Sequence, residues 1–283
     1  MRTRIIRSLV PLGLIAAVLQ PVRGEITAEQ VRPSIRRGTE FLRSRQDTVN
    51  GSWPEQAGYP GGVTALCTLA LLNCGADHDD AAIVRALSYL RARKPKMTYS
   101  TALQTMVFAL AEPEKDRLLI RRNVAWLESI QIKEGAYNGA WSYSQGRGPG
   151  DNSNTQFALL ALYEAERAGV EVKESTWRRS LDYWLRVQHD DGSWGYRGGA
   201  PSTGSMTCAG IGAVVMASGQ LSRGDAQVVA GQVQCCGEQE DDTAAQRGRV
   251  WLGRYFSVHS NPSALARRYR VFSQAWLLCY LYG

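Results

Sequence analysis

The sequence predicts an all-α protein with two concentric layers of helices. A short phrase recurs five times: a basic residue, three further positions, then an aromatic residue followed by a bulky apolar one. Amphipathic helical stretches alternate with stretches that are apolar on nearly every side, and the alternation typical of strands is nowhere sustained. Such recurrence indicates an array of like units, each burying its apolar face against its neighbours. The copies begin at Arg37, Arg85, Arg122, Arg179 and Arg247.

The amphipathic stretches are predicted to form the outer layer. Each carries one copy of the phrase and mixes apolar residues with Arg, Glu and Asp, so one face stays in water. Thr27 and Gln30 have the pattern of a capping box, and Asp79 and Ser175 are expected as N-caps. The predicted outer helices span residues 27–45, 80–93, 114–131, 176–187 and 242–256.

The apolar stretches are predicted to form the inner layer. A helix that is apolar all round is expected to be buried on all sides. Gly75, Gly169 and Gly219 follow three of these stretches at the place of a C-terminal cap. The predicted inner helices span residues 63–73, 101–111, 154–166, 205–218 and 272–282.

In three repeats a Gln ends the outer helix and a Gly-x-Trp segment follows. A Gln amide can donate and accept at once, so we expect it to satisfy backbone groups where the next inner helix begins. The Gly permits a sharp turn, and the Trp covers the junction with a large apolar face. We therefore interpret these residues as structural. They are Gln46 and Trp53, Gln131 and Trp141, and Gln188 and Trp194.

These segments resemble the QW repeat of squalene–hopene cyclases and protein prenyltransferase β subunits, over about residues 30–283. Two copies are degenerate, since Lys94 and Phe256 replace the Gln and Tyr99 replaces the Trp of the second copy. The resemblance implies an (α/α)6 toroid whose inner helices begin around a central cavity. Five hairpins are recognisable of a probable six. We therefore expect a segment downstream of Gly283, or a partner chain, to complete the ring.

The resemblance also implies two kinds of chemistry. The cyclases protonate a polyene with an Asp of a DxDDTA motif at the head of an inner helix, whereas the comparable segment 239–244 lacks the first Asp and opens an outer helix. The prenyltransferases hold zinc with D-x-C and a His, whereas Cys208 stands without either partner. The three His residues fall in loops or at outer-helix ends and are expected to be solvated. We expect no metal and no cofactor. The histidines are His78, His189 and His259.

Polar side chains gather at the expected starts of the inner helices. Helix N-termini expose N–H groups and a positive dipole end, which suits a hydroxyl-bearing or anionic ligand. Asp151 is the one acid close to such a start, with helix capping as its alternative role. Asn154 and Gln156 exceed what a cap needs. The candidate binding residues are Tyr99, Asp151, Asn154, Gln156, Thr207 and Gln274.

Residues 1–24 are predicted to be an export signal. Basic residues precede an apolar core at 9–19, which is too short to span a bilayer, and a small-residue site precedes Glu25. The mature toroid domain, residues 25–283, is therefore expected in a periplasm or outside the cell. The signal contains four of the 33 basic residues and none of the 26 acidic ones, so the mature chain carries +3. That charge gives no case for a nucleic-acid partner.

Six Cys residues in an exported chain permit disulfides. Four of them lie in apolar helical stretches and are interpreted as free thiols in the core, whereas adjacent Cys235 and Cys236 could pair elsewhere or with each other. The four are Cys67, Cys74, Cys208 and Cys279.

Two classes of function remain open. The leading hypothesis is a binding or scaffolding module that takes a protein, a glycan or a lipid at the mouth of the cavity. The alternative is a diverged enzyme, either an isoprenoid cyclase or transferase, or a polysaccharide lyase or hydrolase with Asp151 as its acid or base.

Overall fold

The computed structural model describes residues 27–145, 149–222, 227–229, 232–234 and 240–263. Its internal contacts divide the chain into two compact units, residues 1–38 and residues 39–283. Several predictions fall outside the described residues. These are the export signal, Cys235, Cys236, Cys279, Gln274 and the inner helix expected at 272–282.

The first unit contains the start of helix α1 (Ala28–Arg45). The backbone nitrogen of Thr27 donates to Oε1 of Gln30 at 3.1 Å, and the backbone nitrogen of Gln30 donates to Oγ1 of Thr27 at 3.4 Å. These reciprocal bonds satisfy two N–H groups at the start of the helix. The predicted capping box is confirmed.

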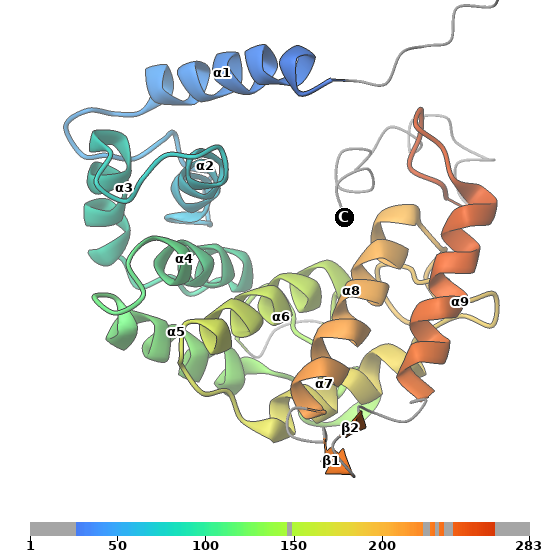
Figure 1. The fold of residues 1–283 in the computed structure, drawn as a ribbon. Helices are drawn as coiled ribbons and strands as arrows, with labels where there is room; N and C mark the ends of the chain where they lie inside the picture. Colours follow the sequence, from blue (N-terminus) through green and yellow to red (C-terminus); the bar gives the residue numbers. More distant parts are fainter. Residues whose placement is uncertain (1–26, 146–148, 223–226, 230–231, 235–239, 264–283) are drawn as a thin grey trace, which may run out of the picture. The chain divides into compact units, whose positions relative to one another are not determined.

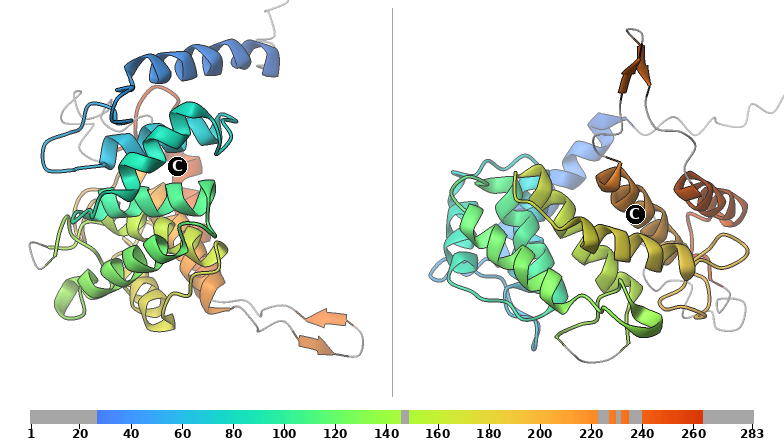
Figure 2. Two further views of the ribbon diagram at one scale, coloured as in Figure 1. Left: turned by 90° about the vertical axis from the view of Figure 1, so that its left-hand side faces the viewer. Right: turned by 90° about the horizontal axis from the view of Figure 1, so that it is seen from below.

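The second unit contains two layers of helices (Figures 1 and 2). Inner helices pack side by side in the order α2, α4, α6 and α8, and outer helices flank this row. Fully buried side chains such as Phe108, Leu127 and Trp184 fill the space between the layers. The inner helices are α2 (Gly62–Asn73), α4 (Thr98–Ala111), α6 (Asn152–Arg167) and α8 (Gly204–Leu221), and the outer helices are α3 (Ala81–Arg91), α5 (Arg117–Ile130), α7 (Glu174–Arg186) and α9 (Glu240–Tyr255).

Two short elements interrupt the helical pattern. A 3-10 turn, η1 (Gly135–Tyr137), lies in the loop between α5 and α6. Strands β1 (Gln227–Val229) and β2 (Gln232–Gln234) form an antiparallel hairpin between α8 and α9, which the sequence did not predict. All other regular elements of the described residues are helices, so the predicted all-α class is confirmed.

Some predicted helix ends were wrong. Helix α4 begins three residues early, because Thr98 is anchored to the preceding loop by its backbone nitrogen and its hydroxyl. Asp80, not Asp79, caps α3, with its carboxylate accepting from the nitrogen of Ala82 at 2.9 Å. Ser175 lies inside α7, which begins at Glu174.

The glycine caps were predicted correctly at two of three places. Gly75 and Gly169 follow α2 and α6 with φ of 91° and 76°, the left-handed conformation that glycine adopts without strain. Gly219 is not a cap, because α8 continues through it to Leu221. Nothing lies within 4 Å of a Cβ built at Gly219, so any small residue would fit there.

The inner helices are not buried on all sides, contrary to the expectation. Leu66 on α2, Leu110 on α4 and Val215 on α8 are 55%, 50% and 53% exposed. Their opposite faces are fully buried, as at Ala65, Phe108 and similar positions. Each of these three helices therefore keeps an apolar stripe that the described residues do not cover completely.

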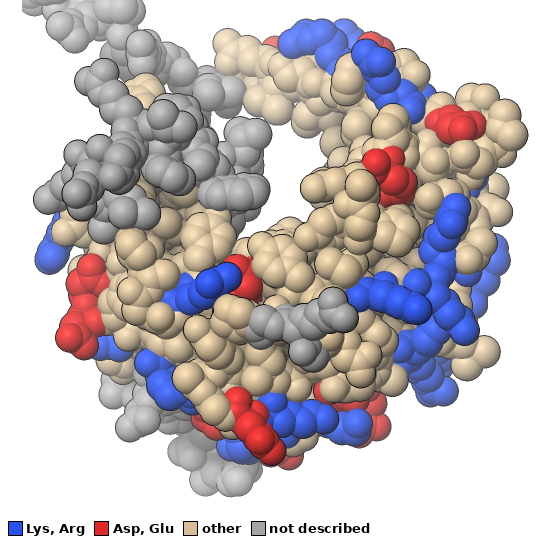
Figure 3. Space-filling model, turned by 180° about the vertical axis from the view of Figure 1, so that it is seen from behind, with Lys and Arg blue, Asp and Glu red and all other residues tan. Residues whose placement is uncertain are grey.

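Charged side chains lie mainly on the outer layer. Figure 3 shows Lys, Arg, Asp and Glu spread over the outer surface of one face of the molecule. On α5 the outward side chain of Arg121 is exposed, whereas Ile120 and Val124 are buried. This division agrees with an outer ring that is amphipathic and an inner ring that is apolar.

The three Gln residues link each outer helix to the next outer helix. Nε2 of Gln131 donates to the carbonyl of Gly139 at 3.2 Å and to that of Thr176 in α7 at 3.0 Å, and its Oε1 accepts from Arg179. The predicted partner, the start of an inner helix, was wrong. Gln46 bonds in the same way to Gly51, Ala82 and Arg85, and Gln188 to Gly192, Ala244 and Arg247.

The Gly and Trp of each junction complete the link to the inner helix. Gly139 has φ of 98°, and a Cβ there would lie 1.9 Å from the carbonyl oxygen of Arg179. The Trp141 indole donates to the carbonyl of Leu127 at 2.8 Å, and its backbone nitrogen donates to Oγ1 of Thr155 in α6 at 3.0 Å. Trp53 pairs likewise with Leu42 and Thr64, and Trp194 with Trp184 and Thr207.

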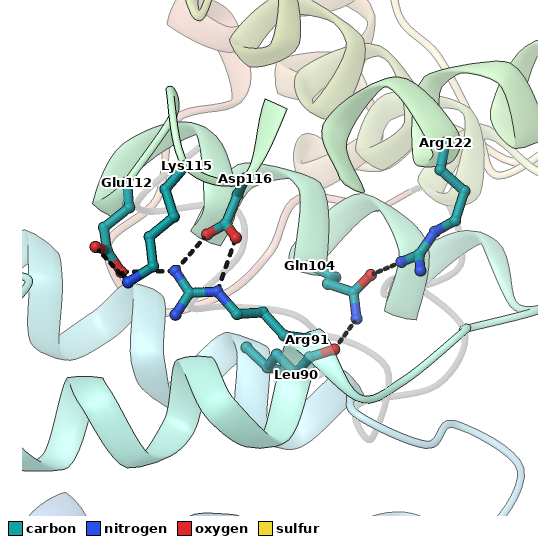
Figure 4. A network of polar contacts seen from close by, with 7 residues as sticks. All are labelled: Leu90, Arg91, Gln104, Glu112, Lys115, Asp116 and Arg122. Atoms are coloured by element: carbon teal, nitrogen blue, oxygen red, sulfur yellow. Dashed lines mark hydrogen bonds and ion pairs between the residues drawn. The ribbon is translucent and has the colours of Figure 1, made fainter. Parts of the chain in front are cut away.

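The second junction, which lacks the Gln, uses a residue of an inner helix instead. Gln104 of α4 is buried, and its Nε2 donates to the carbonyl of Leu90 at 2.9 Å (Figure 4). Its Oε1 accepts from Arg122 at 3.1 Å and from Asn123 at 2.9 Å. Gln104 thus bonds to the Arg of the next outer helix, as Gln46, Gln131 and Gln188 do at theirs.

An ion-pair cluster braces the same junction (Figure 4). Arg91 at the end of α3 contacts Asp116 at 2.7 Å and Glu112 at 2.6 Å. Asp116 is only 2% exposed. The Arg91 guanidinium, together with Lys115, holds the pKa of Glu112 below its usual value.

Candidate functional site

The starts of α4 and α6 lie side by side and bring several predicted binding residues together. Asp151 is the N-cap of α6 and is only 5% exposed. Its Oδ1 accepts from the Asn154 nitrogen at 2.9 Å, from Asn154 Nδ2 at 2.9 Å and from the Ser153 hydroxyl at 2.5 Å. The carboxylate therefore serves as a helix cap that is bound by three donors.

Tyr99 joins this carboxylate through Ser153. The Tyr99 hydroxyl donates to Ser153 Oγ at 2.7 Å, and Ser153 in turn donates to Asp151. Burial raises the pKa of Tyr99, so the phenol keeps its proton and acts as the donor. The result is a directed chain of hydrogen bonds from Tyr99 to Asp151.

Aromatic rings surround the Tyr99 end of the chain. The ring of Phe157 on α6 lies 4.8 Å from the Tyr99 ring, and the ring of Tyr143 lies 6.1 Å from it. Tyr143 is 41% exposed. We call Tyr99, Tyr143, Asp151, Ser153 and Phe157 the Tyr99–Asp151 cluster. It presents a partly exposed aromatic surface with a hydroxyl chain behind it.

Sequence reasoning missed three members of this cluster. Ser153 lies two positions after the cap, and its hydroxyl becomes informative only because Tyr99 of a distant segment reaches it. Tyr143 and Phe157 are aromatic residues whose roles depend on the packing of α4 against α6. No local signal in the sequence distinguishes them from core aromatics.

The other predicted binding residues are dispersed. Asn154 is fully buried and its amide is bound to Asp151, and Gln156 is half-buried on α6. Thr207 is also fully buried, and its hydroxyl donates to the carbonyl of Thr203 while accepting from Trp194. Its polar group therefore belongs to the junction of Gln188 and Trp194 rather than to an open surface. Gln274 lies outside the described residues.

The expectation that all three histidines are solvated was wrong for His189. His78 and His259 are exposed, but the His189 ring is half-buried after α7. Its Nδ1 lies 2.9 Å from Ser202 Oγ, and its Nε2 is buried without a hydrogen-bond partner among the described residues.

No group of three or more His, Cys, Asp or Glu residues in the described part of the chain could hold a metal ion. Cys67 and Cys208 are half-buried thiols on inner helices that form no disulfide among the described residues, and Cys74 is free and exposed at the end of α2. Burial raises the pKa of Cys67 to about 11, so this thiol is protonated at neutral pH. Cys74 was expected in the core, which was wrong.

Within the described ranges, no helix is both long and apolar enough to cross a membrane.

The fold and these junctions define an α/α repeat protein of the cyclase type. The family model described as squalene-hopene cyclase C-terminal domain matches residues 63–206. The chain belongs to this family, and the predicted resemblance to the squalene–hopene cyclases is confirmed. A search of curated proteins found no match.

A second segment comparable with DxDDTA lies at the head of α6, and it was not identified from the sequence. Residues 151–156 read Asp-Asn-Ser-Asn-Thr-Gln and begin an inner helix, whereas segment 239–244 leads into outer helix α9. Asp151 and Thr155 match the motif at its first and fifth positions. Ser153 and Asn154 stand where the motif has its second and third acids. Segment 151–156 thus has one carboxylate where the DxDDTA motif has three.

Proposed function

We propose that this domain binds a ligand at the Tyr99–Asp151 cluster and does not protonate a polyene. The observation that carries the proposal is the replacement of two acids by Ser153 and Asn154 at the head of α6. The remaining carboxylate, Asp151, caps the helix, and its Oδ1 accepts three hydrogen bonds. A carboxylate that serves as a helix cap acts as an acceptor, whereas protonation of a polyene needs a group that donates a proton.

The ligand that the surroundings favour is an apolar molecule with a hydroxyl headgroup. Tyr99 and Ser153 provide a hydroxyl chain at the start of the inner helices. Tyr143 and Phe157 provide apolar surface at the cluster itself, and Leu66, Leu110 and Val215 provide exposed apolar surface elsewhere on the inner helices. Among the partners expected from the sequence, a lipid fits this combination at the Tyr99–Asp151 cluster better than a protein or a glycan.

The enzyme alternative has less support. A glycosidase-type mechanism uses two carboxylates that face each other across the substrate. The Tyr99–Asp151 cluster contains a single carboxylate, that of Asp151. Asp151 would need a second acid to act in that way.

Ligand binding and turnover can be measured together on the processed protein. We expect farnesol or a longer polyprenol to raise the melting temperature without being converted, as followed by mass spectrometry. Tyr99→Phe removes the hydroxyl and should weaken binding about tenfold. Tyr163→Phe, a half-buried tyrosine at the other end of α6, is the matched control. Product formation that Asp151→Asn abolishes would overturn the proposal and establish an enzyme.

We also propose that the domain is exported and that the mature chain begins near Glu25. The support is the basic, apolar and small-residue pattern of residues 1–24. N-terminal sequencing of protein purified from the periplasm or medium should start close to Glu25. An intact Met1 in the cytosolic fraction would contradict export.

A further inference from the structure

A cavity of about 590 Å³ opens at the C-terminal end of outer helix α7, separate from the Tyr99–Asp151 cluster. This volume lies within the range of small-molecule sites, roughly 300–1,000 Å³. The lining comes from η1, from the end of α7 with the residues that follow it, and from a glycine turn. The lining residues that matter here are Tyr137, Arg186, His189, Asp190, Gly198 and Gly199.

Arg186 supplies fixed donors to the cavity. Its Nη2 donates to the carbonyl of Asn138 at 3.0 Å, and its Nη1 to that of Asp182 at 3.4 Å. The guanidinium lies 5.7 Å from the centre of the Tyr183 ring. No ion pair involves Arg186 among the described residues. Backbone carbonyls hold this cation in place, and its other N–H groups remain to donate.

A chain of hydrogen bonds fixes the tautomer of His189. Ser193 donates to Asp191 at 2.5 Å, so its single proton is used. The contact of 2.5 Å between Ser193 and Ser202 then requires Ser202 to be the donor. Ser202 has no second proton, so the bond of 2.9 Å to His189 is donated by Nδ1–H. Nδ1 is therefore the donor of this bond to Ser202.

Acceptor groups line the same cavity as Arg186. Nε2 of His189 is buried and has no partner among the described residues. Asp190 is exposed, and the end of α7 presents helix carbonyls without intrahelical partners. A purely anionic ligand would meet the Asp190 carboxylate, and a cationic one would meet Arg186. A hydroxyl group both donates and accepts, so a polyhydroxylated ligand satisfies the two kinds of group at once.

We propose that this cavity is a carbohydrate-binding site that takes a neutral oligosaccharide. The sugar hydroxyls donate to Asp190 and to the end of α7, and accept from Arg186. The Tyr137 ring provides an apolar surface for the hydrophobic face of a pyranose ring. Gly198 and Gly199 form a turn without side chains, and a Cβ at Gly199 would meet nothing within 4 Å, so the wall leaves room for a bulky ring.

Titration with cellohexaose, xylohexaose and chitohexaose, each followed by isothermal calorimetry and by saturation-transfer NMR, tests the proposal. We expect at least one of them to bind with a Kd in the millimolar range or below. Asp190→Asn and Tyr137→Ala should each weaken that binding about tenfold or more. Asp190 is exposed, so its substitution leaves folding intact even if Tyr137→Ala disturbs the loop.

Asp182→Asn is the matched control, because Asp182 is an exposed acid on α7 that does not line the cavity. Binding should survive this change and also Tyr99→Phe, which separates the cavity from the Tyr99–Asp151 cluster. No binding of any of the three sugars at about 10 mM would overturn the proposal. Binding that Asp190→Asn leaves unchanged, or that Tyr99→Phe abolishes, would place the sugar elsewhere and overturn it too.

Discussion

The second junction and the third one solve the same problem with different residues. At the third, Gln131 follows outer helix α5 and reaches forward to Thr176 and Arg179 of α7. At the second, Lys94 stands at the Gln position, and Gln104 of inner helix α4 reaches outward to Leu90 and Arg122. Both place one buried amide between a backbone carbonyl and the Arg of the next outer helix.

The comparison shows which part of the repeat is required. The carbonyls that end an outer helix and the guanidinium of the next one need a partner that both accepts and donates, and Gln meets both needs from either side. The Gln can therefore stand at different positions in the sequence, but each junction needs its amide. The four predictions that follow test this conclusion, from the largest expected effect to the smallest.

The largest effect is expected at the turn of the third junction. Gly139→Ala places a Cβ 1.9 Å from the carbonyl oxygen of Arg179 and requires a positive φ of an alanine. We expect the free energy of unfolding to fall by about 3 kcal/mol or more, measured by chemical denaturation. Gly75→Ala is the control: its φ is also positive but its Cβ would meet nothing within 4 Å, so about 1 kcal/mol is expected. Equal losses would mean that the close approach does not matter.

Removing the amide should cost the same at both junctions. Gln131→Leu and Gln104→Leu keep the volume and remove the bonds of a buried amide to a carbonyl and to a guanidinium. We expect each to lower the free energy of unfolding by about 2 kcal/mol, measured in urea. A loss at Gln131 with none at Gln104 would show that the second junction does not depend on its inner-helix amide.

The ion pairs of the second junction should add a pH dependence. The folded pKa of Glu112 is depressed, so its contribution is present above the unfolded pKa, near 4.5, and is lost as pH falls through the folded value. We expect less than about 1 kcal/mol, because the pair is partly exposed. Thermal melts between pH 6 and pH 3 should show a smaller acid-induced decrease in Glu112→Gln than in the parent chain. If the melting temperature falls equally with pH in both proteins, Glu112 does not contribute to the acid-induced loss of stability.

The smallest effect is expected for Lys94, which stands where three of the other repeats have Gln. Lys94 is exposed, and its side chain makes no hydrogen bond or ion pair among the described residues. Lys94→Ala should change the free energy of unfolding by less than about 0.5 kcal/mol. A loss comparable to that of Gln104→Leu would show that sequence position, not the position of the amide, defines the junction.

The repeat itself could be predicted from the sequence because its residues recur at fixed offsets. Gln46, Gln131 and Gln188 stand at the same place relative to a Gly and a Trp, and periodicity separates outer from inner helices. The direction of the Gln bond could not be predicted. Whether an amide turns toward the next inner or the next outer helix depends on how two helices distant in sequence are placed.

The candidate site was harder to predict than the fold. Asp151 was found because it is the one acid near an inner-helix start, Asn154 because it exceeds what a cap needs, and Tyr99 because polar residues gather near α4. Gln104 was missed because a Gln in an apolar helix carries no signal until its partners Leu90 and Arg122 are known. Thr207 was expected at an open mouth, yet it repeats the role of Thr64 and Thr155 as an acceptor for a Trp backbone nitrogen.

The forward-reaching Gln bond has a consequence for how such a chain can change in length. At the junctions of Gln46, Gln131 and Gln188, one repeat supplies an amide that bonds to the following repeat. If a whole repeat were duplicated or deleted, the Gln amide at the new junction would still meet a carbonyl and an Arg at the equivalent positions of the next repeat. Duplication or deletion of a whole repeat therefore requires no new contacts between repeats. Loss of half a hairpin would instead leave the Arg guanidinium and the two carbonyls without the Gln amide that bonds to them.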